Sequence, residues 1–128
     1  MYRYLVLVIL LLYGHSTSAH EFTPTYPDLK QSYMAGVLFS TMTLFNLRKD
    51  VTYYEIGVFD ENWEKVPFAV QEKLLSVNYL EKVKVDVFIR SKDRKRAVYV
   101  CSKSKLLIEG TERTSLESRI CSKFKWNY

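Results

Sequence analysis

The side chains that could carry chemistry in this 128-residue chain are two cysteines, Cys101 and Cys121, and two histidines, His15 and His20. If the N-terminal segment described next is removed, one histidine stays, so neither a Ser-His-Asp triad nor a histidine-rich metal site can be assembled. An N-terminal His20 could chelate copper through its amine and ring, but such a site needs a second histidine. The sequence also contains no glycine-rich phosphate loop. We therefore expect no enzymatic activity and no cofactor.

The N-terminal segment, residues 1–19, has the features of a signal peptide. It combines a basic residue, Arg3, with an apolar run from Leu5 to Tyr13 and a small-residue stretch that ends at Ala19. The nine residues of that run are too few to cross a hydrocarbon core of about 30 Å as a helix. We therefore expect export, cleavage near His20, no transmembrane segment afterwards, and one domain formed by residues 20–128.

Composition, net charge and cysteine count indicate whether the chain folds, which partners it could bind and whether its cysteines form a disulfide. Hydrophobic residues make up 48% of the chain and charged residues 26%, which favours a folded domain over a disordered one. The formal net charge of +5 would attract nucleic acid, an anionic membrane or an acidic partner. Export argues against nucleic acid, and an even pair of cysteines in an exported chain predicts a disulfide.

Hydrophobic alternation predicts an all-β fold. From Val83 to Ile89 every second residue is apolar and the residues between them are mostly charged, which is the pattern of a strand with one buried side. Other predicted strands lie at residues 37–46, 51–60, 97–103 and 114–126, with one or two short extended pieces in 68–77. A turn at residues 60–62 would be closed by side-chain hydrogen bonds to the backbone. About seven strands favour a single immunoglobulin-like β-sandwich over a barrel.

The last two predicted strands can be checked against each other as a hairpin. A turn centred on Gly110-Thr111-Glu112 pairs residues whose numbers sum to 222, and Cys101 and Cys121 satisfy that sum. Directly opposed residues lie roughly 4.5 to 5.5 Å apart at Cα, within reach of a disulfide. The register predicts an apolar face formed by Val98, Val100, Leu106, Leu116, Ile120, Phe124 and Trp126. It predicts a charged face, which also contains both cysteines, formed by Lys103, Lys105, Glu117, Arg119, Lys123 and Lys125.

Three motifs follow one another in the second half of the chain. Residues 60–70 end in Pro-Phe-x-Val, residues 90–103 form a charged loop followed by aromatic-x-Cys-x-Lys, and residues 121–124 begin with Cys-x-Lys. In this order they resemble the periplasmic chaperones of the chaperone/usher pilus pathway, in particular the subgroup with a disulfide between the F and G strands. The resemblance implies a PapD-like immunoglobulin fold and a periplasmic location.

The resemblance also implies a function and the residues that perform it. Such chaperones bind an incomplete pilin subunit by lending it a β-strand, and an outer-membrane usher is a further candidate partner. Lys123 would hold the C-terminal carboxylate of the subunit, with Lys30 as the second basic residue. Leu116 and Ile120, together with Ile108 near the loop tip, would be the hydrophobic side chains of the donated strand.

The sequence departs from this family in ways that leave alternatives open. It ends at Tyr128, where the first of the family's two domains would end, and its connection between the last two strands is short. The alternative is a secreted immunoglobulin-like binding or structural module without chaperone activity, and a third reading is a small exported inhibitor or accessory. The basic run from Lys92 to Arg96 could bind phosphates or an acidic surface, although a solvated loop explains it as well.

Overall fold

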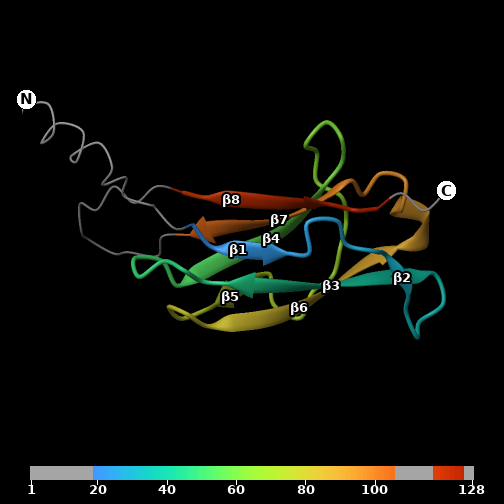
Figure 1. The fold of residues 1–128 in the computed structure, drawn as a ribbon. Helices are drawn as coiled ribbons and strands as arrows, with labels where there is room; N and C mark the ends of the chain where they lie inside the picture. Colours follow the sequence, from blue (N-terminus) through green and yellow to red (C-terminus); the bar gives the residue numbers. More distant parts are fainter. Residues whose placement is uncertain (1–18, 106–116, 126–128) are drawn as a thin grey trace, which may run out of the picture.

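A computed structural model describes residues 19–105 and 117–125 of the chain (Figure 1). The predicted signal peptide, except for Ala19, lies outside the described residues, as do Leu106, Ile108, Leu116 and Trp126. The described part forms two antiparallel sheets packed face to face, which confirms the predicted all-β, immunoglobulin-like sandwich.

The first sheet is centred on a long strand that pairs on both sides. It contains β1 (Glu21–Thr23), β2 (Lys30–Gln31), β3 (Val37–Phe45) and β6 (Lys82–Arg90). β1 and β2 pair with opposite halves of β3, and β6 pairs with β3 along its whole length. The first strand of the sandwich is therefore split into two short pieces, so the described residues hold eight strands where about seven were predicted.

The second sheet has the order β5-β4-β7-β8. Its strands are β4 (Tyr53–Phe59), β5 (Leu74–Ser76), β7 (Tyr99–Lys105) and β8 (Arg119–Lys123), and the short 3-10 helix η1 (Ser91–Asp93) follows β6. Residues 68–77 connect the two sheets: Ala69 pairs with Phe88 of β6, and β5 pairs with β4. The prediction of short extended pieces in this segment is confirmed.

Between the sheets lies the core that the alternation predicted. Tyr54, Ile56 and Val58 of β4 point inward and are at most 2% exposed. On β6 the same holds for Val87, while the charged residues between the apolar ones face solvent. The turn after β4 also forms as predicted, because Oδ1 of Asp60 accepts hydrogen bonds from two backbone N–H groups further along the turn.

The register of the final hairpin is confirmed. Pairs run from Tyr99 with Lys123 to Lys103 with Arg119, and every pair sums to 222. The inner face differs from the prediction in one respect: three serines, Ser102, Ser104 and Ser122, are buried there between the apolar residues. A buried hydroxyl needs a hydrogen-bond partner, and the partners of these serines lead to the site described next.

Candidate functional site

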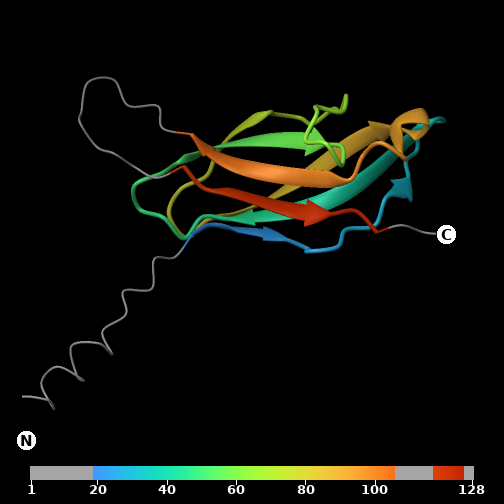
Figure 2. The ribbon, with the colours of Figure 1, turned by 90° about the horizontal axis from the view of Figure 1, so that it is seen from above.

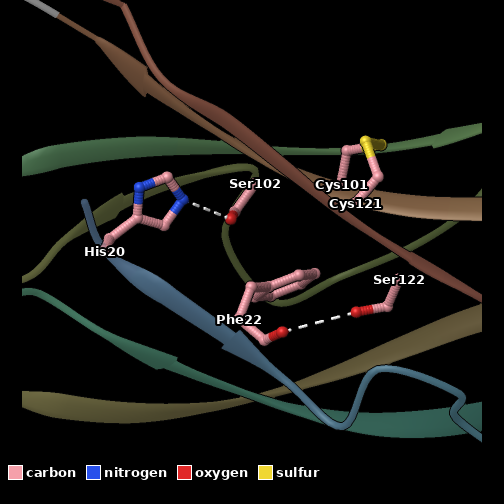
Figure 3. The surroundings of a disulfide bond; sticks show 6 residues. All are labelled: His20, Phe22, Cys101, Ser102, Cys121 and Ser122. Atoms are coloured by element: carbon pink, nitrogen blue, oxygen red, sulfur yellow. Dashed lines mark hydrogen bonds between the residues drawn. A yellow bond between two sulfur atoms is a disulfide. The ribbon is translucent and has the colours of Figure 1, made fainter. Parts of the chain in front are cut away.

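The disulfide predicted from the hairpin register is present. Cys101 of β7 and Cys121 of β8 are directly opposed, with their Cα atoms 4.1 Å apart (Figure 3). Although both lie on the solvent side of the sheet, Cys101 is only 2% exposed. The bond fixes the middle of β8 to the middle of β7.

β8 is the last strand of its sheet, and part of its outer edge is open. N–H groups at even positions point toward β7; the Phe124 N–H, for example, donates to the Val98 carbonyl at 2.9 Å. Because N–H groups alternate in direction along an antiparallel strand, those at odd positions point away from β7. The N–H of Lys123 donates to the Thr25 carbonyl at 3.0 Å. Among the described residues, Arg119 and Cys121 have no backbone partner on that side.

The chain between β1 and β2 covers the C-terminal part of this edge. After β1 it leaves the first sheet and runs beside the end of β8, where the Thr25 and Pro27 carbonyls accept hydrogen bonds from Lys123 and Lys125. Nζ of Lys125 also lies 3.4 Å from a carboxylate oxygen of Asp28. Residues 25–28 therefore cover the C-terminal end of β8 and leave its N-terminal half uncovered by backbone pairing.

His20 holds the other end of β8 in place from inside the sandwich. Its side chain is 2% exposed, and Nε2 lies 2.7 Å from Oγ of Ser102 (Figure 3). Nδ1 lies 3.1 Å from Oγ of Ser118. The ring centroid is 4.6 Å from that of Tyr54. Burial, with a smaller contribution from the charge of Arg48, lowers the pKa of His20 to about 4, against the opposing effect of the Ser102 hydrogen bond. The imidazole is therefore neutral at pH 7, and both of its nitrogens are engaged.

The polar contacts of His20 continue into a buried network around Asn46. The Tyr54 hydroxyl donates to Oδ1 of Asn46 at 2.6 Å, and Nδ2 of Asn46 donates to the carbonyls of Val51 and Val77 at 2.7 and 2.9 Å. Burial raises the pKa of Tyr54 to about 12. Together with His20 and Ser102, this network links the ends of β1, β3 and β5 to β4 and β7 at the end of the sandwich where β8 begins. No sequence pattern predicted this network, although the alternation of serine with lysine in β7 indicates that the inner face there is polar.

The two lysines predicted as a carboxylate anchor lie on different sheets. Lys123 is exposed on β8, directly opposite Tyr99, and Lys30 is exposed on β2. Pro27, whose carbonyl accepts a hydrogen bond from the N–H of Lys125, precedes Lys30 by three residues, a span of at most about 11 Å. Both lysines therefore belong to the same end of the sandwich, and neither takes part in an ion pair among the described residues.

Of the three hydrophobic residues predicted for the donated strand, the described part of the chain contains one, Ile120. Ile120 points to the inner face of the sheet and is partly buried against the core. Leu116 and Ile108 lie outside the described residues.

Metal-binding and membrane-spanning features are missing from the part of the chain that the structure describes. Residues 19–105 and 117–125 contain no group of three or more His, Cys, Asp or Glu side chains that could hold a metal ion. The same residues form no helix with the length and apolar character needed to span a membrane.

Comparison with solved structures shows which known fold this sandwich shares. The E. coli chaperone DraB matches with a TM-score of 0.61 and 15% identity over 83% of this chain and 53% of DraB. A Salmonella enterica structure of the SafA pilin in complex with the SafB chaperone matches with a TM-score of 0.61 and 15% identity, over 87% of this chain and 55% of the other. The periplasmic chaperone SfaE matches with a TM-score of 0.54 and 11% identity, over 84% of this chain and 56% of SfaE.

These matches establish the fold of the periplasmic pilus chaperones for this chain, as the sequence motifs predicted. The chain spans about half the length of the solved structures that it matches. No protein-family model matches the sequence. No curated protein matches it either.

Proposed function

We propose that this protein is a periplasmic, chaperone-like protein of fimbria or pilus assembly that binds an incomplete pilin subunit by adding β8 to the subunit's open sheet. The observation that carries the proposal is the outer edge of β8, where the N–H groups of Arg119 and Cys121 have no backbone partner among the described residues. Unpaired edges recruit further strands. One structure with this fold contains a pilin in complex with a chaperone. The role requires binding alone, without catalysis.

The disulfide supports such a role because it makes β8 rigid before a partner arrives. Strand addition gains main-chain hydrogen bonds, each worth about 0.5 to 1.5 kcal/mol net. A strand that is already held in an extended conformation loses less conformational entropy on binding. The bond between Cys101 and Cys121 holds β8 in an extended conformation at Cys121, which is part of the open edge.

β1 contributes a second strand to the same side of the sandwich. It pairs with β3 on one side only, so it is also an end strand. Oγ of Ser122 in β8 donates to the Phe22 carbonyl of β1 at 3.4 Å, and Figure 2 shows the two strands side by side. An incoming subunit would therefore meet strand edges from both sheets.

The charged and apolar residues predicted from the motifs give this binding mode a register and a specificity. Lys123, with Lys30 at the same end of the sandwich, would hold the subunit's terminal carboxylate through charge-assisted hydrogen bonds. Ile120, with Leu116 and Ile108 from the preceding segment, would enter the subunit's apolar groove. An outer-membrane usher is a further proposed partner.

Co-expression with a pilin-type subunit that lacks its last strand tests the proposal. Arg119→Pro removes one outward N–H at the first residue of an edge strand, where proline is tolerated, and the matched control Arg119→Ala keeps that N–H. We expect the wild-type protein and Arg119→Ala to solubilise and co-purify the subunit, and Arg119→Pro to lose it. Equal yields with both variants would reject β8 as the donated strand.

A second pair of variants tests the carboxylate anchor. Lys123→Ala should weaken capture of the subunit, while Lys92→Ala, which removes the same charge from an exposed position in η1, should not. If the wild-type protein captures no such subunit, the chaperone role is rejected in favour of a secreted immunoglobulin-like binding or structural module.

A further inference from the structure

The outer face of the second sheet contains a hollow that strand donation does not use. The rows of solvent-facing side chains across β4, β7 and β8 are Glu55-Lys103-Arg119, Gly57-Cys101-Cys121 and Phe59-Tyr99-Lys123. The middle row is the lowest, because glycine has no side chain and the two cysteines are bonded to each other. A hollow of about 330 Å³ lies over it and over the charged row beside it.

Two aromatic rings form the apolar part of this hollow. A Cβ built on Gly57 would lie 2.8 Å from Cε2 of Phe59, so the Phe59 ring lies directly over the glycine. Phe68, from the segment between β4 and β5, also lines the hollow and is partly buried. The floor therefore offers an apolar surface, formed by the Phe59 and Phe68 rings, for one apolar side chain.

Cationic side chains surround the floor. The hollow is lined by five of them and one carboxylate, a net charge of +4: Lys65, Lys73, Lys103, Lys105 and Arg119 with Glu55. Within the described residues only Lys103 and Lys105 are neutralised by ion pairs, at 3.1 and 2.8 Å from carboxylate oxygens.

The three other cations are available to an anion. Lys65, Lys73 and Arg119 take part in no ion pair within the described part of the chain. Nζ of Lys73 lies 5.4 Å from the centre of the Phe68 ring, and the guanidinium of Arg119 lies 5.5 Å from the centre of the Phe59 ring. Each of these contacts holds a cation beside the apolar floor without neutralising its charge.

We propose that this cationic hollow is a second binding site, which takes an acidic segment of a partner protein. One apolar side chain of that segment packs on the floor formed by Phe59 and Phe68, and carboxylates on either side of it meet Lys65, Lys73 and Arg119. Because the lining of the hollow is cationic, charge complementarity favours a partner segment with negative charge. The apolar floor favours a peptide over a bare anion, and a flat bilayer surface does not reach a recessed floor.

A titration with a blocked acidic peptide, followed by amide NMR shifts of the whole protein, tests this inference. The probe has one phenylalanine with two glutamates on each side. We expect shift changes concentrated at Gly57, Lys103 and Arg119. The double variant Lys65→Glu with Lys73→Glu should bind roughly tenfold or more weakly, because two attractive contacts become repulsive.

Matched controls separate this site from general attraction to a basic protein. Lys82→Glu with Lys84→Glu makes the same charge change on the outer face of the first sheet and should alter the affinity by less than about threefold. Replacing the phenylalanine of the probe by glycine should weaken binding about fivefold or more. Equal losses in the two double variants would overturn the proposal. So would pyrophosphate or phosphatidylglycerol vesicles that bind as tightly as the peptide.

Discussion

Protonation of His20 should destabilise the fold, because its ring is buried and faces Ser102, Ser118 and the charge of Arg48. Burial lowers the pKa of His20 from 6.5 to about 4. A histidine whose pKa is lower in the folded protein than in the unfolded chain stabilises the fold fully when the pH is above its unfolded-state pKa. This stabilisation is lost as the pH falls through its folded-state pKa. The loss therefore spans pH 6.5 to about 4, and the difference between the two pKa values corresponds to about 3 kcal/mol of unfolding free energy.

Urea unfolding between about pH 7 and pH 4.5 measures this loss, with His20→Gln as the variant that cannot titrate. The wild-type protein should lose unfolding free energy across this range and the variant should stay nearly constant. Hydrogen bonds from Arg48 and Lys105 lower the carboxyl pKa values of Asp50 and Glu55, so the stability that these two groups contribute is lost mainly below about pH 4.5. Equal slopes for both proteins, or an imidazole that titrates near 6.5 by NMR, would refute the reasoning.

Three further variants, one of them a double replacement, test the packing around the site by urea unfolding. Replacing Cys101 and Cys121 together by alanine should cost about 3 kcal/mol for a sequence separation of 20, and no loss would mean that the bridge does not constrain the unfolded chain. Asn46→Ala should cost about 2 to 4 kcal/mol, since it leaves two buried carbonyls without donors, and a cost under about 1 kcal/mol would contradict that network. Gly57→Ala should cost about 1 to 3 kcal/mol and be partly rescued by Phe59→Leu; additive effects would mean that the ring does not press on the glycine.

The final hairpin could be predicted because its constraints lie close together in the sequence. A single register had to place Cys101 opposite Cys121 and separate apolar from charged side chains, and one turn position satisfied both. Alternation along β4 and β6 likewise specified which residues are buried, because the period of a strand is read directly from neighbouring residues.

The parts that the sequence did not reveal depend on contacts between distant residues. His20 is separated by 82 positions from Ser102, its closest hydrogen-bond partner, and no local pattern links the two. β1 and β2 have three and two residues, too few to show a period. The open edge of β8 depends on where residues 25–28 cross over, which follows from the pairing of β1 and β2 with β3.

The hollow could be predicted only in part. Alternation puts Lys103 and Arg119 on the charged face, but the hollow beside them depends on Gly57 being the cross-strand neighbour of Cys101, which the sequence does not show.

Amide hydrogen exchange on the complex with a pilin-type subunit tests strand donation most directly. The N–H groups of Ile120 and Ser122 face β7 and are already paired in the free protein, whereas those of Arg119 and Cys121 face outward. Strand donation predicts that the subunit slows exchange at Arg119 and Cys121 by at least about tenfold, because each outward N–H acquires a backbone partner. Unchanged exchange at both amides in a complex that forms would contradict it.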